Sequence, residues 1–405
     1  MERKRTRSAR ALILIVAAAI ARPAPLEAQQ PPPSGWQEFT QLFDGSLEHD
    51  RIVGGGVIVL QDGRPLARHE HGFADLASGA RVNERTIFHY GSITKTLTAI
   101  AVMQLRDRGR LSLDDDVTRY VPELRSIHDP YASMDRITIR MLLSHCAGFQ
   151  RSTWPYTQGK AWEPFEPTTW EQLVAMMPYQ ELVFKPGSRY GYSNPAFIYL
   201  ARIVETLTGD SWETYVQKNI FGPLGLTRSY FGATPYYLAA DRSHNYTVRV
   251  DSGTESVRDN HADFDPGITR PNSGWNAPLD DMVTYLAFLT GTSKGDSDLK
   301  GRYNAVLKRS SLEEMWRPLF SVDETTATPS GQSNSMGLSF FVLKRGKTTF
   351  IGHTGTQAGF KAFIYLNPSN GKAVAVSLNT VRDSPPLAGQ PAFDTIRDAA
   401  LRLLE

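Results

Sequence analysis

The chain has 405 residues, of which 41% are hydrophobic and 21% charged, enough to build a substantial core in two or three lobes. Residues 1–28 hold six of the 44 basic residues and two of the 42 acidic ones, so the rest of the chain carries a formal net charge of −2 rather than +2. This balance excludes a strongly basic surface that tracks phosphates, and we do not expect nucleic acid as a partner.

The N-terminus has the pattern of an export signal. Five basic side chains within residues 1–10 precede the apolar run 11–21, which is too short to span a bilayer stably. Leu26-Glu27-Ala28 then resembles a small-residue cleavage site. We therefore expect residues 1–28 to be removed as a signal peptide, leaving no stable membrane span, and the protein to be periplasmic or secreted; an uncleaved anchor is the alternative. Residues 29–35, rich in Gln and Pro, predict a flexible lead-in.

A helix and a hairpin are predicted next. Apolar residues recur at helical spacing over 36–43, which predicts an amphipathic helix that ends near Gly45. The runs 52–60 and 65–72 are rich in β-forming residues and flank a turn at 61–63. These runs predict two paired strands.

His69 and His71 lie in the second of these runs and offer two imidazoles on one face of a strand. No third ligand is close to them in the sequence, so we expect ordinary polar side chains on a strand surface and no metal. A metal-dependent hydrolase that uses His69, His71 and Asp75 is kept as an alternative.

The stretch 88–105 is the centre of the functional interpretation. Ser92 stands at the start of an apolar helix, and Lys95 lies three residues on, on the same face. A serine hydroxyl is a poor nucleophile without a base, and a lysine acts as that base only if burial or nearby positive charge lowers its pKa. The spacing therefore predicts a nucleophile with a built-in base. Ser297 and Ser369 also begin an S-x-x-K pattern, but both lie in polar stretches with no apolar helix behind them.

The middle of the chain, from about 100 to 300, is predicted to be mainly helical. Helices are expected to open at Asn194-Pro195 and at Asp210-Ser211, and a further one is expected over 278–289. Residues 230–278 show no clear period and are expected to form long loops near a cleft.

Cys146 is the only cysteine, so no intrachain disulfide can form. We expect it to be a small apolar residue in the segment 142–149. A catalytic thiol next to His145 is the alternative.

Strand character returns near the C-terminus. The β-rich stretches are 336–343, 348–353, 359–366 and 373–378, and a terminal helix follows over 393–404.

Strands at both ends of the chain predict an α+β fold, an α/β sandwich in which one antiparallel sheet is built from the N- and C-terminal segments and flanked by helices. Its α/β lobe would comprise 36–99 and 300–405, and 100–299 would form an inserted, mainly helical lobe. A site is expected in the cleft between the lobes.

Two further motifs accompany Ser92 and Lys95. Tyr192-Ser193-Asn194 places a phenol and a carboxamide at a predicted helix start. His353-Thr354-Gly355, followed by Thr356, ends a predicted strand. A second Y-x-N pattern at 365–367 closes a strand at a hairpin turn and is expected to be structural.

In this order and at these separations, the motifs resemble those of the penicillin-recognising serine hydrolases: serine β-lactamases, D-Ala-D-Ala peptidases, and related esterases and D-aminopeptidases. The motif at Ser92 is the family's S-x-x-K. Tyr192-Ser193-Asn194 matches the Y-x-N form of class C enzymes and carboxyl-esterase relatives, and His353-Thr354-Gly355 stands where the family has K-T-G. The resemblance runs from about residue 36 to the C-terminus and implies a β-lactamase/transpeptidase-like fold.

The resemblance also implies a role for each residue. Ser92 would attack the substrate carbonyl to form an acyl-enzyme, and Lys95, alone or with Tyr192, would accept its proton. Asn194 would hold the amide or ester side of the substrate. The backbone N–H groups of Ser92 and Thr356 would form the oxyanion hole, in which losing one donor typically costs about 3–4 kcal/mol. Which group is the base stays open.

His353 departs from the family pattern. Lysine at this position is a permanent cation that suits a substrate carboxylate, whereas histidine near pH 7 is largely neutral. Affinity for carboxylate-bearing substrates through His353 and Gly355 is therefore in question. H-x-G forms occur among esterase-like and aminopeptidase-like members of the family.

The sequence thus predicts an exported serine hydrolase that acts on a β-lactam, a D-amino-acid peptide or a small ester. Its expected partners are small-molecule or peptide substrates, and no metal or organic cofactor is implied. A binder of β-lactams or peptidoglycan stems that is acylated without turnover is the alternative, because no sequence feature guarantees deacylation. The oligomeric state is not indicated.

Overall fold

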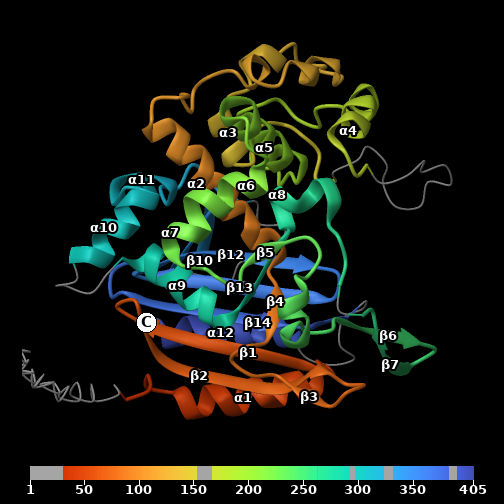
Figure 1. Ribbon diagram of the computed structural model, residues 1–405, viewed down its shortest axis with the longest axis vertical. Helices are drawn as coiled ribbons and strands as arrows, with labels where there is room; N and C mark the ends of the chain where they lie inside the picture. The colour runs from red at the N-terminus through yellow and green to blue at the C-terminus, as the bar shows by residue number, and fades with distance from the viewer. Residues whose placement is uncertain (1–30, 153–166, 262, 292–296, 323–331, 383–389) are drawn as a thin grey trace, which may run out of the picture. The chain divides into compact units, whose positions relative to one another are not determined.

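A nine-stranded antiparallel sheet forms the centre of the computed structural model, in the order β3-β2-β1-β14-β13-β12-β11-β10-β9 (Figure 1). The structure describes residues 31–152, 167–261, 263–291, 297–322, 332–382 and 390–405, so the predicted signal peptide lies outside the described residues. The strands of this sheet are β1 (Gly54–Gln61), β2 (Arg64–Asp75), β3 (Ala80–Arg81), β9 (Phe320–Ser321), β10 (Gln332–Met336), β11 (Phe341–Arg345), β12 (Thr348–Gln357), β13 (Phe360–Asn367) and β14 (Lys372–Leu378).

The two ends of the chain meet in the middle of this sheet. β1 and β2 form the predicted hairpin, and β1 pairs with β14 so that Val57 lies opposite Val376. The predicted α+β fold, with one antiparallel sheet made from both terminal segments, is therefore confirmed.

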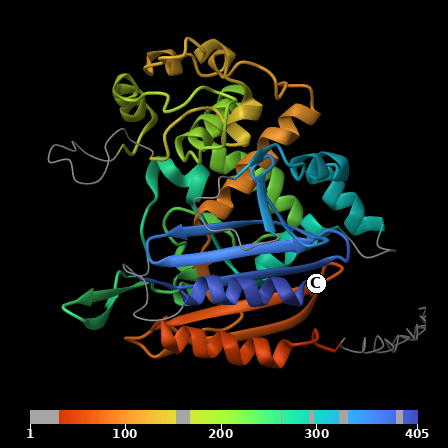
Figure 2. The same cartoon turned by 180° about the vertical axis from the view of Figure 1, so that it is seen from behind.

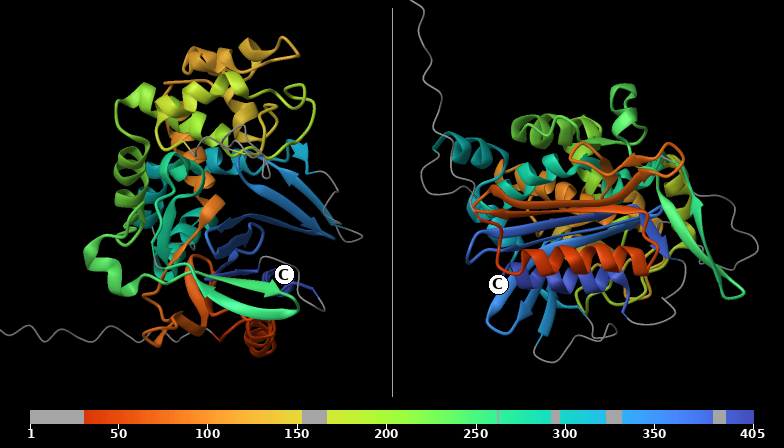
Figure 3. Two further views of the ribbon diagram at one scale, coloured as in Figure 1. Left: turned by 90° about the vertical axis from the view of Figure 1, so that its right-hand side faces the viewer. Right: turned by 90° about the horizontal axis from the view of Figure 1, so that it is seen from below.

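Alternate residues of β1 face two different cores. Val57 and Val59 pack with α1 (Trp36–His49) and α12 (Ala392–Leu403), whereas Ile58 and Leu60 belong to the larger core shared with the helical part of the chain. Figure 2 shows α12 against the sheet from behind, and the right-hand view of Figure 3 shows α1 and α12 side by side across it. The sheet thus separates a two-helix layer from the larger helical layer.

The larger layer is organised around α2 (Thr94–Asp107), whose residues from Thr94 to Leu105 are all buried. Here α9 (Leu279–Thr290) lies against β1, β13 and β14. The remaining helices are α3 (Ile139–Leu143), α4 (Trp170–Met176), α5 (Pro195–Thr208), α6 (Trp212–Val216), α7 (Gly222–Leu224), α8 (Arg270–Ser273), α10 (Ser297–Val306) and α11 (Arg309–Met315). Within the ranges that the structure describes, no helix combines the length and the apolar character needed to cross a bilayer.

The first helix is longer than the sequence predicts. It continues through Gly45 to His49, because Phe39, Phe43 and Leu47 form a buried stripe at four-residue spacing. Glycine in a helix interior costs about 1 kcal/mol relative to alanine, and burial of Leu47 outweighs that cost.

Two expectations about strands were wrong. The stretch 336–343 is not one strand: β10 ends at Met336 and β11 begins at Phe341, because the turn between them packs on other segments, with Leu338 N–H donating to the Met315 carbonyl and Ser339 N–H to the Leu143 carbonyl.

The segment 230–278 is not only loop. It contains the hairpin β6 (Tyr246–Asp251) and β7 (Thr254–Asp259), and the short strands β5 (Tyr230–Phe231) and β8 (Trp275–Pro278). A positive φ at both Ser252 and Gly253 gives the two-residue turn of the hairpin. β8 pairs with β4 (Ile87–His89), the strand that leads to Ser92.

Candidate active site

Ser92 lies in a single 3-10 turn, Gly91–Ile93, that leads directly into α2. The turn packs against β12 so closely that a side chain at Gly355 would collide with the Tyr90 carbonyl and approach Ser92 N at 3.2 Å. Gly91 has a φ of +48°, and a Cβ there would lie 2.9 Å from Thr356 N. Glycine at these two positions thus brings the backbone of Ser92 and Thr356 together.

Lys95 is fully buried one helical turn after Ser92. Its Nζ lies 3.1 Å from Ser92 Oγ, 2.9 Å from Asn194 Oδ1 and 2.9 Å from the backbone oxygen of Asn272. The three partners come from the turn before α2, from the residue before α5 and from α8. The amine therefore ties the elements of the site together.

Burial and then the nearby Arg151 guanidinium hold the pKa of Lys95 well below its usual value. A neutral amine has two N–H donors and one lone pair. Asn194 Oδ1 and the Asn272 oxygen can only accept, so they take the two N–H groups. The lone pair is then left for the hydroxyl proton of Ser92.

Tyr192 completes the polar group around Ser92. The Ser92 side chain interacts with its phenol, and Lys95 Nζ lies 4.9 Å from its ring centroid. Burial raises the pKa of the Tyr192 phenol above its usual value, so the phenol keeps its proton at neutral pH.

Asn194 occupies the N-cap of α5, and Pro195 follows at the first helical position, as predicted. An N-cap asparagine commonly accepts from the first turn of its helix, but this side chain makes no such hydrogen bond. Its oxygen accepts from Lys95 instead.

His353 is buried on β12 and faces the same site. Its Nδ1–H donates to the Thr354 carbonyl over 2.6 Å, while Nε2 has no partner among the described residues. Burial, and next the Lys95 charge, lower the pKa of His353 to about 3. His353 is therefore a neutral hydrogen-bond acceptor at neutral pH and not the cation that lysine would be.

A cavity of about 740 Å³ opens at Ser92 and is lined by all of the predicted site residues except Lys95 and Gly355. Arg151 and Arg189 also line it, and none of the described lining residues is acidic. The guanidinium carbon of Arg151 lies 5.4 Å from the ring centroid of Tyr192. The cavity is thus suited in size to a small molecule and in charge to an anionic group.

Sequence reasoning missed three contributors to the site. Asn272 acts through its backbone oxygen, and Arg151 lies in a loop, so neither has a local sequence signal. The sequence marks His145 only as a neighbour of Cys146. Its ring stacks on Tyr192 with centroids 4.3 Å apart, and its Nδ1 accepts from Ser193 N–H.

The other S-x-x-K patterns are not assembled in this way. Ser369 donates to Asn367 Oδ1 in the β13–β14 turn, and Lys372 donates to the Leu403 carbonyl. A helix begins at Ser297, but it is rich in polar residues and Lys300 on it is exposed.

Cys146 is buried, as predicted, and burial raises the pKa of its thiol to about 11. A thiol of this kind is not a thiolate at neutral pH, which argues against its use as a nucleophile.

The metal set with Asp75 is not formed. His69 and His71 contact Asp44 of α1, whereas Asp75 lies with His244. His69 and His71 also face the layer formed by α1 and α12, because His69 lies directly opposite Val57, which packs in that layer. Ile93, which is next to Ser92, belongs to the core on the other side of the sheet.

Known proteins resemble this chain in sequence and in fold. The family model described as Beta-lactamase matches residues 39–397. Protein flp of Staphylococcus aureus strain N315 is 23% identical over 344 residues, which are 85% of this chain and 63% of that protein. The chain therefore spans less than two thirds of the length of this curated relative. Esterase EstB of Burkholderia gladioli is 33% identical over 198 residues, 46% of this chain and 48% of the esterase.

The fold has solved counterparts as well. An octameric penicillin-binding protein homologue from Pyrococcus abyssi superposes with a TM-score of 0.72 at 24% identity, covering 91% of this chain and 77% of that one. Identity at this level establishes a common fold.

Proposed function

The chain belongs to the beta-lactamase family, and on that basis we propose that it is a serine hydrolase in which Ser92 attacks a substrate carbonyl and forms an acyl-enzyme. The observation that carries the proposal is the 3.1 Å contact between Lys95 Nζ and Ser92 Oγ beside the cavity. This contact joins a hydroxyl to an amine whose pKa is lowered by burial.

In the acylation step, the Ser92 oxygen bonds to the substrate carbonyl carbon and its proton passes to Lys95 Nζ. The direction of the pKa shifts favours Lys95 over Tyr192 as the base, since the amine loses its proton readily and the phenol does not. The N–H groups of Ser92 and Thr356 then stabilise the oxyanion.

Collapse of the tetrahedral intermediate needs a proton on the leaving group. We infer that the Tyr192 phenol, which interacts with the Ser92 side chain, donates this proton and is reprotonated from Lys95. Deacylation reverses the sequence with water in place of the leaving group. The alternative function is a binder that is acylated but not turned over.

A small ester or amide with an anionic group fits the cavity best. The only positive charges among the described lining residues are those of Arg151 and Arg189, while His353 is neutral. The similarity to Esterase EstB supports an ester. β-Lactams and D-amino-acid peptides, which carry a carboxylate, remain within the proposed substrate class.

Labelling and turnover test this proposal together. The chain is incubated with a fluorophosphonate probe and, separately, with a chromogenic cephalosporin, a short-chain p-nitrophenyl ester and a D-Ala-D-Ala peptide. We expect one covalent adduct per chain, located by mass spectrometry on Ser92, and steady release of product from at least one substrate. One equivalent of product followed by no turnover would identify the binder instead. An adduct on another residue would contradict the proposal.

Arg151→Ala should discriminate between substrates. A charge-assisted hydrogen bond contributes about 1.5–3 kcal/mol, so kcat/KM for a carboxylate-bearing p-nitrophenyl ester should fall about 10- to 100-fold. Hydrolysis of p-nitrophenyl acetate should fall by a smaller factor, because loss of the Arg151 charge raises the pKa of Lys95 while burial, the larger cause, still holds it low. Arg81→Ala, which removes another arginine stacked on an aromatic ring, is the matched control and should affect neither substrate. Equal losses on both esters would show that Arg151 does not bind the anionic group.

We also propose that the protein is exported. The basic and apolar pattern of residues 1–28 supports this, with cleavage after Ala28. A lead-in over 29–35 and a hydrolase domain over 36–405 would follow. N-terminal sequencing of the protein recovered from the periplasm or medium should begin at Gln29; retention of the full chain in the membrane would indicate an anchor.

A further inference from the structure

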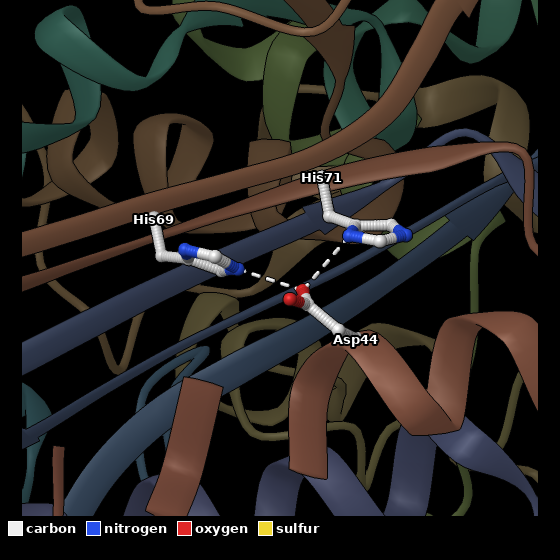
Figure 4. A group of neighbouring side chains, drawn as sticks. All are labelled: Asp44, His69 and His71. Carbon is white, nitrogen blue, oxygen red and sulfur yellow. Dashed lines mark hydrogen bonds and ion pairs between the residues drawn. The ribbon is translucent and has the colours of Figure 1, made fainter. Parts of the chain in front are cut away.

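Two imidazoles and one carboxylate converge on the face of the sheet opposite Ser92 (Figure 4). His69 and His71 project from β2, and Asp44 reaches them from α1. Asp44 Oδ1 lies 2.7 Å from His69 Nε2 and 3.0 Å from His71 Nδ1. All three ligand atoms lie within 4.8 Å of one another.

This spacing suits a transition metal. Zinc binds imidazole nitrogen and carboxylate oxygen at about 2.0–2.2 Å, which places neighbouring ligand atoms about 3.4 Å apart in a tetrahedral site. The two contacts to Asp44 therefore need to lengthen by less than about 1 Å to admit the ion. Each of the three side chains is between 27% and 33% exposed, so water can reach the remaining coordination position. Two nitrogens and one oxygen favour zinc, copper or nickel over magnesium or calcium, which prefer oxygen ligands.

The bonding of Asp44 sets this cluster apart from a second one, Asp75, His244 and Asp259. There the carboxylates are held by backbone donors: Asp75 accepts from two N–H groups, and Asp259 accepts from one. The only hydrogen bonds and ion pairs found for the Asp44 side chain among the described residues are those to the two imidazoles. The Asp44 carboxylate can therefore bind a cation once each imidazole carries its proton on its other ring nitrogen and presents a lone pair to the ion.

We propose that Asp44, His69 and His71 bind one zinc-like transition metal ion that fastens α1 to β2. Each neutral imidazole keeps its single proton by carrying it on the nitrogen that faces away from the metal: Nδ1 of His69 and Nε2 of His71. The ion bridges a helix and a strand that are otherwise joined through side-chain packing, including the edge-on contact of Phe43 with His69.

The site has a structural role and not a catalytic one. His69 and His71 share the face of the sheet that packs on α1 and α12, and Ser92 belongs to the opposite side. Removal of the ion should therefore leave the hydrolysis proposed for Ser92 unchanged. This separation makes the metal site testable even if the proposed hydrolase activity fails.

The test uses the untagged chain, stripped with a chelator and dialysed into metal-free buffer. Titration with zinc chloride should give one bound ion per chain by calorimetry, and zinc in excess over its dissociation constant should raise Tm by about 3 °C or more. Magnesium chloride should produce neither effect. Cobalt chloride should give a visible absorption band that zinc displaces.

Variants assign the ion to the cluster. His69→Gln and His71→Gln should each remove the zinc-dependent Tm shift and lower affinity at least 10-fold, with a metal-free Tm close to that of the unchanged chain. His244→Gln, in the second cluster, is the matched control and should keep the full shift. If one variant fails to fold, the other two still decide the assignment.

Two results would overturn the proposal: no saturable binding of zinc to the unchanged chain, or a shift that survives in both His69→Gln and His71→Gln. Loss of Ser92-dependent ester hydrolysis on chelation, restored by zinc, would overturn the structural role assigned to the ion.

Discussion

Ser92→Ala should abolish hydrolysis of every ester, amide and β-lactam that the protein accepts, lowering kcat/KM by at least about 10⁴-fold. The substitution removes the hydroxyl oxygen that lies 3.1 Å from Lys95 Nζ and leaves the amine with two acceptors, Asn194 Oδ1 and the Asn272 oxygen. The turn is held by backbone contacts and glycines, so we expect the variant to fold. Steady-state kinetics with the best substrate measure the effect.

The chain supplies its own control for this experiment. Ser369 also begins an S-x-x-K pattern, but its hydroxyl donates to Asn367 Oδ1 and its lysine, Lys372, bonds elsewhere. Ser369→Ala should keep full activity. If Ser92→Ala retained the activity of the unchanged chain, Ser92 could not be the nucleophile.

Lys95→Arg should be almost as severe, with kcat reduced about 10³-fold. A guanidinium has a pKa above 12 and cannot accept the Ser92 proton, so the variant keeps the positive charge and loses the base. Lys372→Arg, which changes the lysine of an unassembled motif, should have little effect. Activity in Lys95→Arg equal to that of the unchanged chain would exclude Lys95 as the base.

The pH dependence of the unchanged chain follows from the same group. Because burial lowers the pKa of Lys95 in the folded protein, the neutral amine forms below the value of about 10.4 that applies to the unfolded chain. kcat/KM should therefore be absent at low pH and should rise as the pH passes upward through the folded pKa of Lys95. If kcat/KM instead fell as the pH rose through this pKa, activity would require a protonated lysine, which would contradict the mechanism.

The sequence predicted those parts of the site that follow local geometry. Ser92 and Lys95 are one turn apart on a helix, and Asn194-Pro195 marks a helix start, so their positions could be predicted without coordinates. Their convergence could be predicted only through the family resemblance, because 99 residues separate Lys95 from Asn194.

The remaining features depend on contacts that no local pattern shows. Arg151 faces the cavity because of the path of a loop, and Asp44 meets His69 only because α1 crosses β2. The break between β10 and β11 has a similar origin: a side chain at Gly337 would collide with the Met315 carbonyl, so the bend is imposed by a distant segment. The course of α1 through Gly45 was likewise decided by burial and not by intrinsic propensity.

The pairing of β1 with β14 also governs when the protein can fold. Gly55 and Leu378, which lie opposite each other, are more than three hundred residues apart, so β1 emerges from the ribosome long before its partner strand. Until translation has passed β14, the growing chain lacks the inner neighbour of its first hairpin and cannot close the sheet. The nascent polypeptide therefore stays incompletely folded through most of its synthesis. Secretion machinery can thread a chain across a membrane while the chain is in this state.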